Sequence, residues 1–256
     1  MMNYTEVNSK TIDKWTEDGW EWGVPISHET FLNAKNGIWD VLLTPIKPVP
    51  KEWFLPFYKN NSLANAKLLG LASGGGQQMP IFAALGALCT VLDYSSKQLD
   101  NERLVSEREA YPIDIVKADM TKALPFPDGS FDLIFHPVSN CYIEDVFHVW
   151  KECFRVLKPG GVLLAGMDNG INYLFDDKEP LKVVNKLPFN PLQDPELYKK
   201  SIEQNDGIQF SHTMEEQIGG QLKAGFTLTD LYEDHDTYGI GLYYPPFIAT
   251  RSVKAD

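Results

Sequence analysis

Short apolar runs alternate with helical spacings through the middle of the chain, and the first such run ends in a glycine-rich turn. Residues 68–72 are uninterrupted and apolar, which suits a strand buried on both faces of a parallel sheet. The turn at 73–76 follows, and residues 77–85 then have the spacing of a helix. Strand, glycine turn and helix in this order predict the nucleotide-binding start of a doubly wound fold, in which glycines let the backbone approach a ligand closely.

Two further predicted strands end in an acid. Residues 87–93 end at Asp93, where a carboxylate can accept hydrogen bonds from both ribose hydroxyls of an adenosine ligand. The alternative is that Asp93 only caps the following loop. That cap does not require Asp93, because Ser95 and Gln98 are expected to form a capping box there. The next strand, at 113–120, ends in the pair Asp119 and Met120.

Two later runs complete an ordered set of four motifs. They are Leu-Pro-Phe-Pro-Asp-Gly-Ser-Phe-Asp-Leu-Ile-Phe at 124–135 and Arg-Val-Leu-Lys-Pro-Gly-Gly at 155–161. Over about residues 62–168 the set resembles the class I S-adenosylmethionine-dependent methyltransferases with a methyltransferase-11-like domain. The resemblance implies S-adenosyl-L-methionine as the cofactor. It also implies an α/β fold: a Rossmann-like, doubly wound sheet of about seven strands, mostly parallel with an antiparallel last strand and with helices on both faces.

The resemblance also assigns roles within the site. In that family the acid matching Asp119 binds the adenine amino group, and the residue matching Met120 donates its backbone amide to the ring. The family's usual acid in the glycine motif corresponds to Gly70 here, so either another group holds the ammonium of the methionine moiety or binding is weaker. The expected cofactor-binding residues are Ser73, Gly74, Gly75, Gly76, Asp93, Tyr94, Asp119, Met120 and His136.

A second departure lies at Ala72, where the family pattern has its first glycine. A nicotinamide-dinucleotide fingerprint fits the turn less well, because its third glycine would fall on Gln77.

Composition narrows the class of protein. The chain has 256 residues, 43% of them hydrophobic, which suits one α/β domain with additions. No apolar run approaches the roughly twenty residues that span a bilayer, and the start lacks the regions of a signal peptide. Three cysteines without metal-like spacing favour reduced thiols, a cytoplasmic location and no bound metal. A net charge of −12 opposes nucleic-acid and membrane partners, and a homodimer stays open.

The organisation along the chain is uneven. We expect a Trp- and Pro-rich prelude at 1–60 and a cofactor-binding domain at 61–256, with an irregular, polar insertion at about 169–212. Five of the six tryptophans lie in the prelude. Trp20 and Trp22 are candidates for a lid over the cofactor, although such residues could equally pack the prelude against the sheet.

The candidate for a catalytic base is His136, at the end of a predicted strand at 131–135. The alternative is that it only lines the pocket or bonds the loop backbone. His212 is a weaker candidate. We expect a methyltransferase acting on a small-molecule acceptor. The competing hypothesis is a non-catalytic cofactor-binding or assembly protein with the same fold, which the missing acid at Gly70 would suit.

Overall fold

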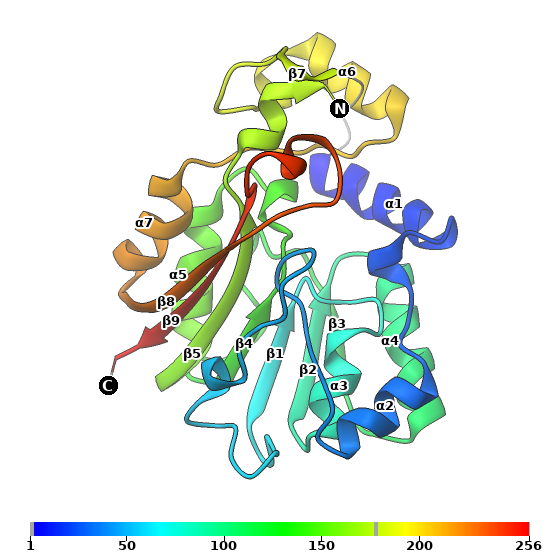
Figure 1. The fold of residues 1–256 in the computed structure, drawn as a ribbon, viewed down its shortest axis with the longest axis vertical. Coiled ribbons are helices and arrows are strands. Elements are labelled where there is room, and N and C mark those ends of the chain that lie inside the picture. The colour runs from blue at the N-terminus through cyan, green and yellow to red at the C-terminus, as the bar shows by residue number, and fades with distance from the viewer. Residues whose placement is uncertain (1–2, 177–178, 256) are drawn as a thin grey trace.

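The computed structural model describes residues 3–176 and 179–255, and its centre is a seven-stranded sheet in the order β3-β2-β1-β4-β5-β9-β8. β9 pairs antiparallel with both β5 and β8, while the pairs from β3 to β5 are parallel. The predicted fold class is therefore confirmed (Figure 1). The strands are β1 (Lys67–Leu71), β2 (Leu88–Asp93), β3 (Asp114–Lys117), β4 (Phe131–His136), β5 (Leu157–Asp168), β8 (Phe226–Asp234) and β9 (Phe247–Lys254).

Helices cover both faces of the sheet because its central strands are apolar at consecutive positions. Leu68 of β1 points into one core, whereas its neighbour Leu69 points into the other. α3 (Gln78–Ala84) and α4 (Ser96–Glu109) lie on one side of the sheet, and α5 (Val146–Val156) and α7 (Met214–Ala224) lie on the other (Figure 1). Within the described residues, no helix is long and apolar enough to cross a membrane.

The two helices on the second face are joined by polar contacts as well as by packing. α5 buries an apolar stripe that includes Val149 and Trp150. The indole Nε1 of Trp150 donates to the carbonyl oxygen of Glu216 in α7 at 3.0 Å. α7 begins with a complete capping box between Thr213 and Glu216. This start and the tie to α5 fix α7 against the sheet.

The prelude divides into two parts with different surroundings. Residues 28–60 include α2 (His28–Lys35) and a 3₁₀ turn, η2 (Lys51–Phe54), and their side chains join the core beneath α3. Trp39 and Trp53 belong to that core. By contrast, α1 (Tyr4–Glu17) lies near the carboxyl ends of the parallel strands (Figure 1).

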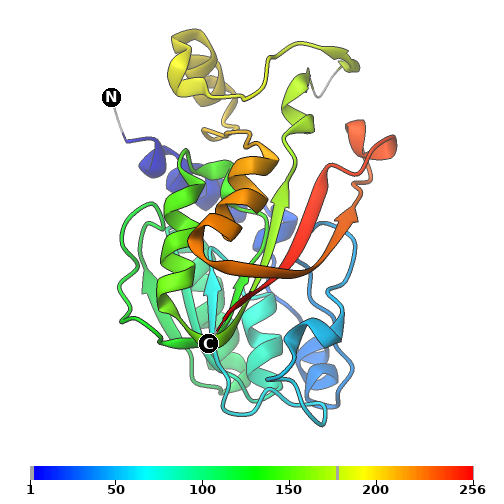
Figure 2. The ribbon, with the colours of Figure 1, turned by 90° about the vertical axis from the view of Figure 1, so that its left-hand side faces the viewer.

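The insertion is more regular than its composition predicts. It contains a two-stranded sheet of β6 (Phe175–Asp176) and β7 (Glu179–Val183), followed by α6 (Pro195–Gln204). The prediction of an irregular segment was wrong at α6, where Asp194 accepts hydrogen bonds from two backbone amides and Pro195 opens the helix. The segment stands beyond the carboxyl edge of the sheet (Figures 1 and 2). Its residues 177 and 178 lie outside the described residues.

α1 is tied to both of its neighbours. The side-chain amide of Asn8 donates to the carbonyl oxygen of Ile208 at 2.9 Å, and Asn8 Oδ1 accepts from Ile208 N at 2.6 Å. On the other side, Asp13 Oδ1 accepts from Ser95 Oγ at 2.6 Å and from Lys97 N at 3.0 Å, at the start of α4. The prelude, the insertion and the loop after β2 thus form one connected rim.

Ala72, which follows β1, has a left-handed backbone with φ of +48°. A residue with a Cβ pays a steric cost in this region, and glycine does not. The family's glycine at this position therefore has a physical reason that applies to this chain as well.

Replacing Ala72 by glycine should leave the free energy of unfolding unchanged or raise it by up to about 1 kcal/mol, because relief of roughly 1–2 kcal/mol of backbone strain exceeds the added entropy of the unfolded chain. Urea unfolding measures this. The matched control is Ala83→Gly inside α3, which should lose about 1 kcal/mol. An equal loss in both variants would contradict the prediction.

Candidate functional site

A large cavity opens at the carboxyl edge of the parallel strands. Its volume is about 1350 Å³, which exceeds the roughly 300–1,000 Å³ typical of sites for one drug-sized ligand. The turn after β1 and the segments at the ends of β2, β3, β4 and β5 supply the floor, and α1 and the insertion supply the walls. The space accommodates two small ligands side by side.

Asp93 lies at the centre of this floor, beside Gly74. Its Oδ2 accepts from Gly74 N at 3.1 Å, and its Oδ1 accepts from Ser95 N at 2.9 Å. Burial raises the pKa of Asp93, while these amide hydrogen bonds oppose the rise. Each carboxylate oxygen can accept more than one hydrogen bond, so the group can still receive ligand hydroxyls. Ser73 and Tyr94 line the same part of the cavity.

The loop after Asp93 is capped differently from the prediction. Ser95 Oγ accepts from Gln98 N as expected, but the Gln98 side chain donates to Thr16 Oγ1 of α1 at 3.1 Å. The capping box is therefore only half formed, and Asp93 does help to hold the loop. Asp93 can hold the loop in this way and still bind a ligand.

Gly75 and Gly76 face α4 and are not among the residues that line the cavity. Gly75 N donates to the carbonyl oxygen of Gln98 at 2.9 Å, and Gly76 N donates to Glu102 Oε1 at 2.8 Å. A Cβ on Gly76 would lie 2.9 Å from the carbonyl oxygen of Asn101. The sequence places these two glycines against a ligand, whereas the structure uses them for close packing with a helix.

Asp119 and Met120 follow β3 and line the cavity together with Asp93. Asp119 Oδ1 accepts from Thr121 N at 2.9 Å, which orients the carboxylate. The Met120 side chain is buried and packs in the core below. The structure thus brings both predicted adenine-binding residues to the same cavity as the predicted ribose-binding residue.

His136 lies beneath the cavity rather than in it. Its imidazole is fully buried, with Nδ1 2.9 Å from the Leu71 carbonyl oxygen and Nε2 2.8 Å from the side-chain amide of Asn140. Burial lowers the pKa of His136, which favours the neutral ring, while its hydrogen bonds to Leu71 and Asn140 oppose the shift. It is absent from the cavity lining, and its placement does not favour a base. His212 is also buried, with Nε2 bonded to the carbonyl oxygens of Asn140 and Ile143.

Gly70 stands where the family has an acid, and the Met79 side chain packs against it. A Cβ on Gly70 would lie 2.6 Å from Met79 Sδ. Any larger side chain there would have to displace the Met79 side chain, which is itself fully buried. The space that an acid at position 70 would need is therefore occupied by the Met79 side chain.

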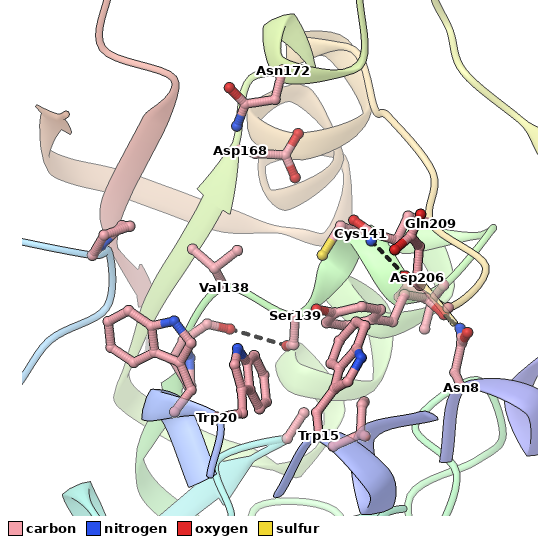
Figure 3. A pocket seen from close by; sticks show the side chains of 18 of the residues that line it. Asn8, Trp15, Trp20, Val138, Ser139, Cys141, Asp168, Asn172, Asp206 and Gln209 are labelled. Atoms are coloured by element: carbon pink, nitrogen blue, oxygen red, sulfur yellow. Dashed lines mark hydrogen bonds between the residues drawn. The ribbon is translucent and has the colours of Figure 1, made fainter. Parts of the chain in front are cut away.

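The tryptophans of the prelude separate into two groups, one that lines the cavity and one that lies in the core. Trp15, Trp20 and Trp22 line the cavity, and the rings of Trp15 and Trp20 lie 5.3 Å apart. Figure 3 shows Trp15 and Trp20 on one side of the pocket. Trp39 and Trp53 are instead buried in the core.

Sequence reasoning missed Asp168, the last residue of β5. The side chain lines the cavity but is only 3% exposed. Its Oδ1 accepts from Gly170 N at 2.8 Å, and its Oδ2 has no hydrogen-bond partner among the described residues. Burial raises the pKa of Asp168 to about 6. The signal was available, since Asp168 ends a strand as Asp93 does.

Known proteins match this chain along most of its length. A model of the methyltransferase domain matches residues 69–165. The uncharacterized methyltransferase YbaJ of Bacillus subtilis is 44% identical over 253 residues, covering 96% of this chain and 97% of YbaJ. Sterol 24-C-methyltransferase of Aspergillus fumigatus is 30% identical over 185 residues, covering 70% of this chain and 45% of the fungal protein. The chain therefore spans less than half of that sterol enzyme.

Solved structures share the fold at lower identity. An S-adenosylmethionine-dependent methyltransferase from Mesorhizobium loti has a TM-score of 0.59 and 20% identity, covering 79% of this chain and 94% of that one. The [4+2]-cyclase SpnF has a TM-score of 0.53 and 18% identity, covering 75% of this chain and 76% of SpnF. At such identity these neighbours show the fold alone.

A buried carboxylate behind the glycine turn makes stability depend on pH. Glu102 Oε1 accepts from Gly76 N, but Oε2 has no hydrogen-bond partner among the described residues. Burial, together with the charge of Asp93, raises the pKa of Glu102 from 4.5 to about 8. Between these values the folded protein binds one more proton than the unfolded chain. Glu102 makes its whole contribution to the free energy of unfolding below pH 4.5, and this contribution is lost as the pH rises through about 8.

Glu102→Gln cannot ionise, so its free energy of unfolding relative to the wild type should increase by up to about 1.4 kcal/mol per pH unit within that window. Urea unfolding at several pH values measures the difference. Glu107→Gln, an exposed change on the same helix, is the control and should show no such trend. A Glu102→Gln difference that is constant with pH would show that Glu102 ionises normally.

Proposed function

The chain belongs to the S-adenosylmethionine-dependent methyltransferases and uses S-adenosyl-L-methionine as its cofactor, and from this we propose that it methylates a small-molecule acceptor. The observation that carries the proposal is the cavity of about 1350 Å³, because its size suits a cofactor and a second small ligand together. Residues of α1 and of the insertion line its walls. The net charge of −12 disfavours a nucleic-acid acceptor.

The cofactor would extend across the ends of β3, β2 and β1. Asp119 and Met120 would hold the adenine, Asp93 the ribose, and Ser73 and Gly74 the part beyond it. This arrangement is supported by their common place in one cavity. A second observation supports it: Gln98 lines the same region, and its buried Oε1 has no hydrogen-bond partner among the described residues. A polar ligand there would supply one.

The bound cofactor supplies a methyl carbon activated by a positively charged sulfur. What the chain contributes is position and the exclusion of water. Trp15, Trp20 and Trp22 offer aromatic faces to the cavity, and such faces attract cations. We therefore assign these three tryptophans to the wall beside the sulfonium.

A non-catalytic protein that binds the cofactor is the second candidate function. The observation that favours it is Gly70, where Met79 fills the space of the family acid. SpnF also carries this fold, although its name describes a cyclase. A methylated product would exclude this candidate, and binding without turnover would support it.

Asp93→Asn should weaken binding of S-adenosylhomocysteine at least about tenfold, because a charged acceptor for two hydroxyls is lost while a loop-bonding oxygen remains. Isothermal titration calorimetry measures the affinity, and thermal unfolding verifies the fold. The control is Asp100→Asn, an exposed change on α4 with the same loss of charge. Equal affinities in wild type and Asp93→Asn would remove the ribose assignment.

Cofactor binding should change tryptophan emission through the residues that line the cavity. Trp22→Phe and Trp20→Phe should each reduce the change caused by S-adenosylhomocysteine, because an aromatic face beside the ligand reports its arrival. Fluorescence titration measures this. Trp39→Phe, in the same prelude but buried in the core, should leave the change intact. If only Trp39→Phe reduced it, the lid assignment would fail.

A further inference from the structure

Strand order separates the cavity into two halves. The residues assigned to the cofactor follow β1, β2 and β3, which lie on one side of the switch point between β1 and β4. Asp168 ends β5, beyond β4 on the other side. A ligand lying over β3, β2 and β1 reaches β4 with its far end, so the space over β5 is left for the acceptor.

Asp168 is built into this second half with one oxygen uncommitted. Oδ1 is held by Gly170 N at 2.8 Å, which fixes the carboxylate, while Oδ2 has no hydrogen-bond partner among the described residues. In Figure 3, Asp168 and Asn172 lie across the pocket from Trp15 and Trp20, with Val138 and Ser139 between them. A buried oxygen without a partner is costly, so a ligand that donates a hydrogen bond is favoured there.

The charge and surface of the cavity favour a cationic ligand. Among the described residues that line it, the basic side chain is Lys200, whereas acids come from every side. A negative cleft attracts cations and repels anions. Aromatic rings near Asp168, including Tyr142 and Tyr173, add further attraction for a cation. Besides Asp168, Asp93 and Asp119, the acids that line the cavity are Asp18, Glu21, Asp206 and Asp236.

We propose that Asp168 is a catalytic residue that binds and deprotonates the acceptor, and that the acceptor is a primary or secondary amine. This inference rests on the proposed function and names its substrate class. The amine donates a hydrogen bond to Oδ2, which places its nitrogen in the half of the cavity over β4 and β5.

The transfer balances with no further reactant. The bound ammonium first gives one proton to Oδ2 of Asp168, which frees the electron pair of its nitrogen. That nitrogen then forms a bond to the methyl carbon, the carbon–sulfur bond breaks, and its electron pair goes to sulfur, which becomes neutral. Asp168 releases its proton to solvent as the methylated ammonium product leaves.

Asp168 and the groups around it have the protonation states that this proton transfer requires. Asp168 is ionised at neutral pH because its pKa is about 6. The titratable groups that face it are Cys141, Tyr142 and Tyr173, and burial raises the pKa of all three, so they stay neutral. An alkylammonium, with a pKa of ~10, can yield its proton to such a base far more readily than an alcohol can.

A binding experiment tests the inference without knowledge of the natural acceptor. The probes are 2-phenylethylamine and its neutral analogue 2-phenylethanol, titrated into the protein saturated with S-adenosylhomocysteine. The wild type should bind the amine at least about tenfold more tightly, because only the amine satisfies the carboxylate with a charged donor. Asp168→Asn should lose this preference and keep its affinity for S-adenosylhomocysteine.

The control is Asp100→Asn, which removes a charge from an exposed side chain on α4 that does not line the cavity, and it should retain the preference. Equal binding of the two probes to the wild type, or a preference that persists in Asp168→Asn, would overturn the inference. Failure to bind S-adenosylhomocysteine would instead overturn the proposed function beneath it, so the two failures are distinguishable.

Turnover provides a second measurement. A metabolite extract is separated by cation exchange and each pool is incubated with protein and methyl-labelled S-adenosylmethionine. Label should enter the retained, cationic pool, and Asp168→Asn should reduce it roughly 100-fold, the scale of a lost general base. Label confined to the unretained pool would show that the acceptor is not an amine.

Discussion

Two carboxyl groups that bind the glycine turn, half-buried Asp93 and buried Glu102, fix the geometry on which the rest of the cavity depends. Asp93 accepts from Gly74 N, and Glu102 accepts from Gly76 N, so the turn is held from β2 and from α4 together. Removal from water raises the pKa of each of these carboxyl groups. The turn leaves no room for side chains, since Cβ atoms at these glycines would meet α4. The carboxyl groups hold the turn in place, but taking them out of water costs free energy when they are charged.

From that turn, the rim of the cavity is assembled by segments distant in sequence. Asp13 of α1 bonds the start of α4, and Asn8 of the same helix bonds Ile208 near the end of the insertion. Beneath the rim, His136 lies between the end of β1 and Asn140, whose amide bonds Gln217 of α7. His136 therefore links the floor of the cavity to a helix on the outer face. Its contribution is to the shape of the site.

Acids at the ends of strands lie in two different parts of the cavity. Asp93 and Asp119 follow neighbouring parallel strands and meet on one side of the switch point. Asp168 ends β5 on the other side and is buried, and one of its oxygens has no hydrogen-bond partner in the part of the chain that the structure describes. The carboxyl ends of parallel strands lie at one edge of the sheet, so acids that end different strands line the same cavity.

The sequence by itself determined the sheet, its helices and the location of Asp93 and Asp119, because apolar runs and strand-end acids are local patterns. The same rule would have found Asp168. Only the tertiary structure decided that Gly75 and Gly76 face α4, that His136 is buried, and that the tryptophans divide between core and cavity. Each of those outcomes depends on which distant segment packs against the residue. Local periodicity gives the spacing of side chains along an element, but their surroundings are set by contacts that exist only in the folded chain.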